Sequence, residues 1–595
     1  MSANNHDYYA ADHYKVDGSG VLYYTDSNEK VEMETSTPIA NHSPMLQRIV
    51  RKDDGFDIKE SVEFSARLNG RNEPAVCIDK KTMIGNQPHV NFSPGCRIYR
   101  GRGNIAKYSE FMQIQCEDAK IETVYTHTGW INLDGKRIFL NGENSIDENG
   151  LTPDYTVELD SDFKPFCFYP VEDDTAECFS TVMDGIAETV PDRVHIPLMA
   201  YTFLTPLNGM LREAGKEPCF SLYLIGKTGS YKSSISKLLL CFFGTFSYAT
   251  PAPISFEDTQ GMVARKMGVG ADLPLLLDDR RPTNNSVDRL KYEGMEKKVS
   301  SAIGDRAARG RLNSDCTART TITAKCNLMV TAEEAFVNIG SSSIARSVSI
   351  ELEPDCVNFD NLQKLQDTPQ HFNKVMQLYI QWLIKHWESI NKNSDHLLKD
   401  YRKLFSEAGH ARLATAFSQL MFGYHVFLCF LKDMEQITDE KAEKMLDRAK
   451  TIFLTMCDAQ SKKVESEKPT TLFVNLLKEM LQSQKVRLKD VDSTSDFTPP
   501  NLIGYRDSDY LYLQSQNTYN AVVKFYAESG CTFPASRDSL WKMFMDEGKI
   551  RPGNSRGKNT SYKVKKIQGK SIKAIWLMAS VLNENDDEKE EDLNE

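Results

Sequence analysis

Residues 221–243, SLYLIGKTGSYKSSISKLLLCFF, predict a strand, a loop and a helix in close succession. The first five residues are apolar and typical of a short buried strand, and SISKLLLCFF has an apolar helical face that ends before Gly244. The loop between them, GKTGSYKS, is of the kind that wraps a phosphate with backbone N–H groups. The helix that follows adds further donors and the positive end of its dipole. The stretch therefore predicts an α/β core with a nucleotide site.

The side chains of this loop have separate expected roles. Lys232 is expected to bind the β- and γ-phosphates of ATP, and Ser233 to coordinate Mg²⁺. Tyr231 stands where such loops usually have glycine, so Gly229 is expected to supply the tight turn. The alternative is an ordinary Gly- and Ser-rich turn. The residues predicted to contact ATP are Gly226, Lys227, Thr228, Gly229, Ser230, Tyr231, Lys232, Ser233 and Ser234.

Two later apolar strands end in polar side chains. LPLLL, residues 273–277, leads into Asp278, predicted to coordinate Mg²⁺, and Asp279, predicted to activate the attacking water. CNLMVTAEE, residues 326–334, places Thr331 where its hydroxyl can hold that water against the γ-phosphate. A strand that ends in a polar turn is the alternative for the first of these segments.

Two arginines follow in positions suited to a nucleotide phosphate. Arg346 precedes a strand in SSSIARSVSIEL, residues 341–352, and is predicted to reach the nucleotide of a neighbouring subunit. Arg412 opens the helix ARLATAF and is predicted to be a second sensor of ATP. An arginine on the protein surface is the alternative for both.

The net charge of −11 conceals two opposite regions. Residues 583–595 carry eight acids and one lysine, whereas residues 542–573 carry ten Lys or Arg and two acids. A second basic segment lies between Asp279 and Thr331, and a solvated basic loop is its alternative reading. The residues predicted to bind DNA are Arg306, Arg309, Arg311, Arg319, Lys325, Lys563, Lys565 and Lys566.

The whole chain of 595 residues reads as a multidomain α/β protein. Hairpin turns are expected at Asn69-Gly70 and Asp134-Gly135 in a region of short β-prone runs. The expected parts are a loose N-terminus (1–15), a β-rich domain (16–165), an ATPase core (175–355), a helical segment (356–460), a charged linker (461–471), a winged-helix domain (472–582) and a disordered acidic tail (583–595).

The cysteines and the apolar runs indicate the compartment. Thirteen scattered cysteines without a C-x-x-C pair are typical of reduced thiols and exclude zinc-site spacing. The N-terminus has no secretory pattern, and the most apolar run, residues 420–431, is too short to span a bilayer. A cytoplasmic protein without a membrane partner is expected.

The order of these motifs resembles that of AAA+ ring ATPases, and most closely the MCM-like helicases of bacterial mobile elements, the Cch type of staphylococcal chromosome cassettes. HTGW (127–130), SFEDT (255–259) and PLLLDD (274–279) are local features of that wider group and of related prophage ATPases. The resemblance covers about residues 20–582. It implies a hexameric ring that unwinds single-stranded or forked DNA with ATP, a DNA-binding N-terminal collar, and replication proteins of the same element as partners.

Two other functions stay open at this stage. An AAA+ initiator or loader would bind DNA without unwinding it, and a small-molecule kinase would use the same phosphate loop. The winged-helix-like end disfavours the kinase.

Overall fold

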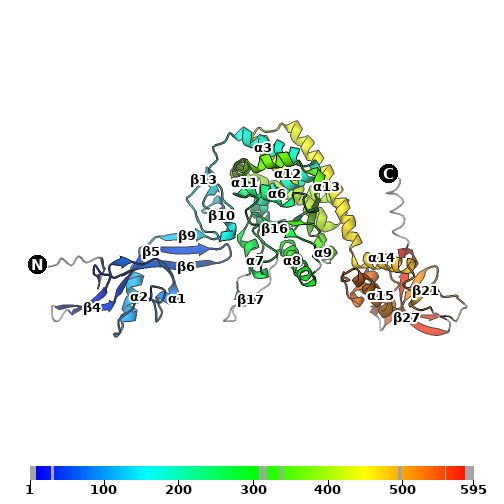
Figure 1. Cartoon of the computed structure of the whole chain (residues 1–595), viewed down its shortest axis with the longest axis horizontal. Coiled ribbons are helices and arrows are strands. Elements are labelled where there is room, and N and C mark those ends of the chain that lie inside the picture. The colour runs from blue at the N-terminus through cyan, green and yellow to red at the C-terminus, as the bar shows by residue number, and fades with distance from the viewer. Residues whose placement is uncertain are drawn as a thin grey trace.

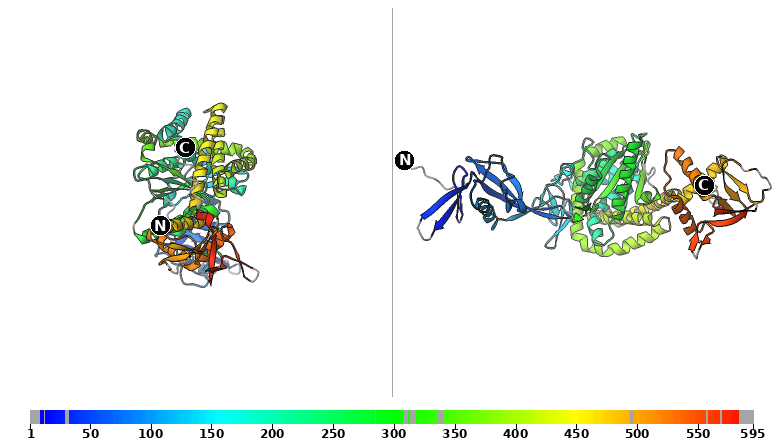
Figure 2. Two further views of the ribbon diagram at one scale, coloured as in Figure 1. Left: turned by 90° about the vertical axis from the view of Figure 1, so that its right-hand side faces the viewer. Right: turned by 90° about the horizontal axis from the view of Figure 1, so that it is seen from below.

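The computed structural model describes residues 9–11, 13–28, 33–283, 285–306, 311–312, 318–319, 321–334, 340–493, 497, 499–555, 558–567 and 569–582. The molecule is elongated, with a β-rich N-terminal region, a central α/β core and a C-terminal module along one axis (Figures 1 and 2). The acidic tail and Arg309 lie outside the described residues.

The N-terminal region consists of three antiparallel or mixed sheets. Their orders are β1-β2-β3-β4, β14-β9-β5-β6-β7 with β8 on β6, and β10-β11-β12-β13. The elements are β1 (Tyr9–Ala11), β2 (Tyr14–Val16), β3 (Leu22–Asn28), β4 (Met33–Ala40), β5 (His42–Asp53), β6 (Ile58–Leu68), β7 (Arg71–Asn72), β8 (Val76–Asp79), α1 (Lys80–Met83), α2 (Asn104–Ile114), β9 (Ile121–Tyr125), β10 (Gly129–Leu133), β11 (Lys136–Leu140), β12 (Ser145–Asp147), β13 (Gly150–Thr152) and β14 (Thr156–Val157).

Both predicted hairpin turns in this region are confirmed. Asn69 and Gly70 connect β6 to β7 with φ of 49° and 75°, and Asp134 and Gly135 connect β10 to β11 with φ of 51° and 83°. Two successive residues with positive φ match the twist of the flanking strands, which is why Asn-Gly and Asp-Gly are favoured there.

The central core contains a four-stranded parallel sheet in the order β16-β19-β15-β20. Pro274 is the first residue of β16, where its missing N–H is tolerated. The elements are α3 (Thr175–Thr189), α4 (Asp192–Leu204), α5 (Asn208–Glu213), β15 (Ser221–Ile225), α6 (Lys232–Leu240), α7 (Gln260–Val269), β16 (Pro274–Arg280), α8 (Ser286–Asp305), β17 (Arg311–Leu312), β18 (Ala318–Arg319), β19 (Asn327–Ala332), α9 (Ser341–Ile344) and β20 (Ser347–Glu351).

The helical segment shares the apolar cluster of this core. Its helices are α10 (Phe359–Gln366), α11 (Pro369–Ser406), α12 (Ala411–Asp433) and α13 (Asp439–Ser466). The cluster extends from Phe139 on β11 to Val464 on α13, so part of the N-terminal region also belongs to it. Trp130 on β10 connects the N-terminal region to the core. Its ring centre lies 4.9 Å from that of Trp387, and its Nε1 donates to Pro206 O at 2.7 Å.

Helix α12 contains the apolar run that the sequence places at residues 420–431. The helix has 23 residues and is long and apolar enough to cross a membrane, but 83% of its apolar window is buried inside the protein. It packs against α4, α11 and α13, as a core helix does. The twelve cysteines of the described part are free thiols.

The charged segment predicted as a linker is mostly helical. Helix α13 continues to Ser466, and α14 begins at Pro469. Lys and Glu are good helix formers, and pairs such as Lys462 with Asp458, 3.4 Å apart, support the helix. Charge alone did not distinguish an exposed helix from a loop.

The C-terminal module has its own apolar core around a five-stranded sheet, β21-β22-β23-β27-β26. Its elements are α14 (Pro469–Gln482), β21 (Arg487–Asp490), β22 (Leu502–Arg506), β23 (Tyr510–Leu513), α15 (Ser515–Glu528), α16 (Arg537–Asp546), β24 (Gly553–Ser555), β25 (Lys558–Thr560), β26 (Lys563–Ile567) and β27 (Lys570–Met578). Short 3-10 helices complete the described chain: η1 (Ser161–Phe163), η2 (Thr205–Leu207), η3 (Cys241–Phe243), η4 (Pro354–Cys356) and η5 (Ala579–Leu582).

Candidate nucleotide-binding site

The loop after β15, which the sequence predicts to bind phosphate and which we call the phosphate loop, is shaped by two glycines and by Tyr231. Gly226 cannot be replaced without a clash, because an added Cβ would lie 2.2 Å from Leu352 O. Gly229 has φ of 87°, and Tyr231, at the N-cap of α6, adopts the left-handed conformation with φ of 59°. A tyrosine thus takes the conformation that glycine usually supplies. Its ring packs 5.4 Å from that of Phe359.

Lys232 is folded onto its own loop. Its Nζ donates to Gly226 O at 2.6 Å and to Lys227 O at 2.9 Å. Burial lowers the pKa of the ammonium, and the charges of Glu333, Asp279 and Asp278 oppose that shift. The ammonium also lies 3.4 Å from Ser230 Oγ, and among the described residues it forms no ion pair that would have to break before it moved to a phosphate.

The predicted metal ligands meet at the carboxyl edge of the sheet. Ser233 Oγ donates to Asp278 Oδ1 at 2.7 Å, and Thr331 Oγ1 donates to the same carboxylate oxygen. Hydroxyl and carboxylate oxygens are the ligands Mg²⁺ prefers, with phosphate and water completing its shell. Ser233 and Asp278 therefore fit Mg²⁺, although the described residues contain no group of three or more His, Cys, Asp or Glu able to hold a metal alone.

Asp279 lies in a bulge at the end of β16. Its φ is 72°, and its N–H donates to Thr331 Oγ1 at 2.8 Å. The Asp279 carboxylate, 46% exposed, pairs with Arg281. Thr331 therefore joins both acids, to one through its hydroxyl hydrogen and to the other through its oxygen.

Glu333 is a functional candidate that the sequence interpretation missed. It follows Thr331 by two residues, and its carboxylate accepts a hydrogen bond from Thr228 Oγ1 of the phosphate loop. The signal was present in the acidic pair of TAEE, residues 331–334, directly after the strand.

Arg346 and Arg412 lie together, away from the phosphate loop of their own chain. Arg346 Nη1 donates a hydrogen bond to Ser342 Oγ, and Arg412 Nη1 lies 3.5 Å from the same oxygen. Both guanidinium groups, with that of Arg402, line a pocket of about 180 Å³, and none of the described residues lining it is acidic. Arg412 therefore lies beside Arg346, and its role as a second sensor of ATP stays a prediction.

The stem of Arg346 is held tightly in this pocket. Its side chain is 14% exposed, and its Nη2 pairs with Asp305 at 2.8 Å. A Cβ at Gly304 would lie 2.2 Å from Arg346 Cδ. Its buried Nε has no hydrogen-bond partner within the described part of the chain.

Comparison with known proteins finds a likeness to a solved structure over nearly the whole chain. No protein-family model and no curated protein matches the sequence. The solved structure named "SCCmec type IV Cch - active helicase" is similar with a TM-score of 0.58 and 12% identity, over 97% of this chain and 100% of that chain. The chain shares the fold of that helicase. The apo NrS-1 C-terminal region covers 72% of this chain and 91% of its own at 12% identity, but its TM-score of 0.26 carries no argument.

This likeness confirms the multidomain α/β prediction over nearly the whole chain. At 12% identity it establishes the fold and leaves the activity to be argued from the site.

The structure corrects two of the predicted DNA contacts, Arg306 and Lys325. The Arg306 side chain is 12% exposed and donates to Pro218 O, to Ala324 O at 3.0 Å and to Cys326 O at 2.9 Å. It terminates α8 with φ of 44° and ties three backbone carbonyls together. A guanidinium whose N–H groups donate to the chain's own carbonyls stabilises the fold and has few donors left for a phosphate.

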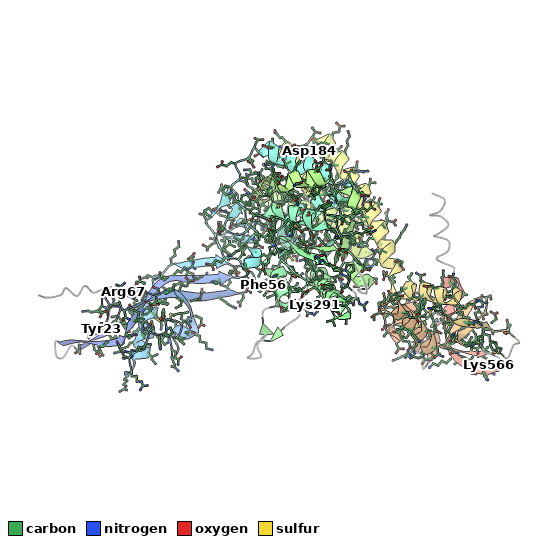
Figure 3. The ribbon with its side chains drawn as sticks, in the orientation of Figure 1. Tyr23, Phe56, Arg67, Asp184, Lys291 and Lys566 are labelled. Carbon is green, nitrogen blue, oxygen red and sulfur yellow. The ribbon has the colours of Figure 1, made fainter. Side chains whose placement is uncertain are left out.

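Lys325 likewise contacts its own chain. Its Nζ donates to Gly55 O at 2.6 Å and lies 3.9 Å from the centre of the Phe56 ring. Gly55 and Phe56 form the tip of the β5–β6 hairpin, which reaches the core in Figure 3. Burial lowers the pKa of Lys325. The basic segment is therefore anchored at both ends.

DNA binding by the middle of that segment, Arg309, Arg311 and Arg319, stays a prediction. Arg311 and Arg319 are paired in register across the β17–β18 hairpin, which lies below α7 and α8 in Figure 1. Arg309 falls outside the described residues.

The three predicted DNA-binding lysines of the C-terminal module lie on β26 and differ in their surroundings. Lys565 Nζ donates to Tyr512 OH at 2.8 Å and lies 3.4 Å from Asp507 Oδ2. Lys563 lies 4.8 Å from the ring centre of Trp576. Lys566 is exposed, at the outer end of the module in Figure 3. Successive residues of a strand face opposite sides, so Lys566 is on the other face from the first two.

Proposed function

We propose that this protein is an ATP-dependent DNA helicase of the AAA+ class that acts as a hexameric ring in replication of a mobile genetic element. Its parts would be a DNA-binding β-rich collar, an AAA+ core with a helical segment, and a C-terminal winged helix. ATP and Mg²⁺ would be its cofactors, and DNA and other replication proteins of the element its partners. The shared fold with a structure named as a helicase supports this proposal.

The proposal depends on the separation between the phosphate loop and the pair formed by Arg346 and Arg412. Ser221, the first residue of β15, donates its N–H to Arg346 O at 3.0 Å, whereas the phosphate loop follows Ile225 at the other end of the strand. Four residue steps of about 3.3 Å place these ends about 13 Å apart. The arginines therefore face away from the lysine of their own chain. In a ring, the arginine edge of one subunit would face the loop edge of the next.

The chain's own residues would divide the work of hydrolysis. Lys232 would leave the loop carbonyls to bind the γ-phosphate, and Ser233 with Asp278 would hold Mg²⁺. Asp279 would accept the proton of the attacking water, with Thr331 positioning that water. Bound Mg²⁺ would supply charge neutralisation between the phosphates. Arg346 and Arg412 of a neighbouring copy would stabilise the transferring phosphoryl group.

The proposed DNA contacts now exclude Arg306 and Lys325. Arg309, Arg311 and Arg319 remain as a basic hairpin for the ring channel, where phosphates of one strand would be bound. Lys563, Lys565 and Lys566 remain as candidates on the C-terminal module.

Subunit mixing tests the shared site. Lys232→Ala and Arg346→Ala are each expected to lower ATP hydrolysis by at least about a hundredfold. In an equal mixture about one interface in four combines an intact loop with an intact arginine, so part of the activity returns. Lys237→Ala on the same helix, whose ammonium contacts Tyr248 O, and Arg193→Ala beside β20 are matched controls. Absence of rescue at every mixing ratio would contradict a site shared between subunits.

A strand-displacement assay on a forked duplex separates a helicase from a loader. ATP-dependent release of the labelled strand is expected from the wild-type chain and not from Lys232→Ala. DNA binding and ATP hydrolysis without strand release would replace the helicase by an initiator or loader.

A further inference from the structure

The five-stranded sheet of the C-terminal module has two unlike faces. Helices α14, α15 and α16 cover one face, where Ile503, Leu513 and Leu577 join the module's apolar core. The opposite face carries Tyr505, Tyr510, Tyr512, Ile572, Ala574 and Trp576, and this second cluster contains no residue from any described helix. We call it the aromatic face.

Cations lie over the rings of the aromatic face. Lys563 and Lys565 lie 4.8 and 5.3 Å from the ring centre of Trp576. Arg551 lies 5.8 Å from Trp576 and 5.9 Å from Tyr510. Asp507 is the carboxylate that pairs with Lys565. Three cations thus lie close to these aromatic rings, and one carboxylate pairs with them. The group has a net positive charge and forms a positive surface.

The rings themselves offer further contacts. Tyr510 is half-buried, and Met578 at the end of β27 is 36% exposed. The buried Nε1 of Trp576 has no hydrogen-bond partner among the described residues. A buried donor without an acceptor is costly.

Helix α16, the second helix of the helix–helix–hairpin order, has no such excess of positive charge. Its exposed residues include Asp538 and Asp546 with Lys542 as their one basic counterpart. Arg537 is paired with Asp538 at 2.8 Å. Helix α16 therefore carries two acids and two bases and has no net charge. A helix that enters the groove of a duplex meets phosphates on both sides, and α16 lacks the positive surface that this role favours.

We propose that the C-terminal module binds single-stranded nucleic acid on the aromatic face and does not read a duplex through α16. Arg551 and Lys563 would contact phosphates, and a base would stack on Tyr510 at the open edge of the cluster. A single strand fits because its bases are free to stack, whereas a duplex encloses them. This inference rests on the proposed function, since it names the surface and the class of nucleic acid.

Binding of a fluorescein-labelled oligothymidylate to the full chain without ATP tests the assignment by fluorescence anisotropy. The double variant Arg551→Glu/Lys563→Glu is expected to lose at least about tenfold in affinity at low salt, with a salt slope reduced by about 1.4. Tyr510→Ala is expected to lose about fivefold, the lower end of stacking on one base. The matched double variant Lys524→Glu/Lys542→Glu changes the charge equally on exposed positions of α15 and α16 and is expected to bind normally.

Photocrosslinking locates the contact when other surfaces of the chain also bind DNA. An oligonucleotide with 5-iodouracil is expected to crosslink to peptides that contain Tyr510 or Trp576. Crosslinks confined to other parts of the chain, or an equal loss of affinity in the control double variant, would overturn the inference. The inference would also be overturned if the chain bound a duplex more tightly than the oligothymidylate and only the control double variant weakened that binding. ATP hydrolysis and forked-duplex unwinding report on the proposed function separately, because these variants leave the phosphate loop intact.

Discussion

The phosphate-loop edge of the sheet and the basic segment from Arg306 to Lys325 both attracted functional predictions, and the structure treats them differently. At the loop edge, Ser233, Asp278 and Thr331 meet through hydrogen bonds although they come from three separate segments. In the basic segment, Arg306 and Lys325 turn to carbonyls of their own chain.

The difference shows what each kind of pattern encodes. A phosphate loop depends on local backbone geometry, and the ends of neighbouring parallel strands must share one edge, so order and spacing predict the meeting point. A cluster of basic residues gives only charge. The partners of Arg306 and Lys325, Pro218 and Gly55, lie far away in sequence, and no local pattern announces them.

Replacing Asp278 should have the largest effect. Asp278→Asn is expected to lower ATP turnover by about a thousandfold, since losing one charged ligand of Mg²⁺ costs about 4 kcal/mol of transition-state stabilisation. Steady-state hydrolysis at saturating Mg²⁺ measures it, with the exposed Asp360→Asn on α10 as control. Near-normal turnover would break the claim that strand-end spacing identified the metal ligand.

The second prediction compares Asp279 with Glu333, the acid that the sequence interpretation missed. Asp279→Asn should lower turnover about a hundredfold, the usual contribution of a general base. Glu333→Gln should cost about tenfold, because its hydrogen bond to Thr228 shapes the loop. Single-turnover hydrolysis with bound ATP separates this effect from nucleotide binding. The reverse order would assign water activation to Glu333.

Much of the loop edge was predictable from sequence, and the remainder was hidden for physical reasons. The multidomain α/β class and the turn dipeptides follow from local preference. Tyr231 in a left-handed conformation was not predictable, because its cost is met by packing on Phe359, more than a hundred residues away. The pairing of Arg412 with Arg346 was not predictable either, because the two residues are 66 positions apart and meet only through Ser342 and a shared pocket. The aromatic face was missed because its residues come from separate strands.

The third prediction concerns Arg306 as a structural residue. Arg306→Ala should lower the free energy of unfolding of the core by about 3 kcal/mol, since three backbone carbonyls lose their cationic donor and Glu217 loses one of its two arginine partners while it retains Arg212. Thermal unfolding measures it, with Lys298→Ala on the exposed side of α8 as control. The salt slope of DNA binding should stay unchanged. Normal stability together with a shallower slope would restore the DNA contact.

The smallest effect should come from Lys325→Met, which keeps the apolar stem and removes the charge. We expect a loss of about 1 kcal/mol, because one charge-assisted hydrogen bond to Gly55 O and one contact with the Phe56 ring disappear while a burial cost that already lowers the pKa of Lys325 is relieved. Faster amide exchange at the tip of the β5–β6 hairpin would accompany it, and Lys59→Met, exposed on β6, should change neither. If Lys325→Met weakened DNA binding and left the hairpin tip protected, Lys325 would belong with the phosphate contacts after all. The basic segment would then have been as readable from sequence as the phosphate loop.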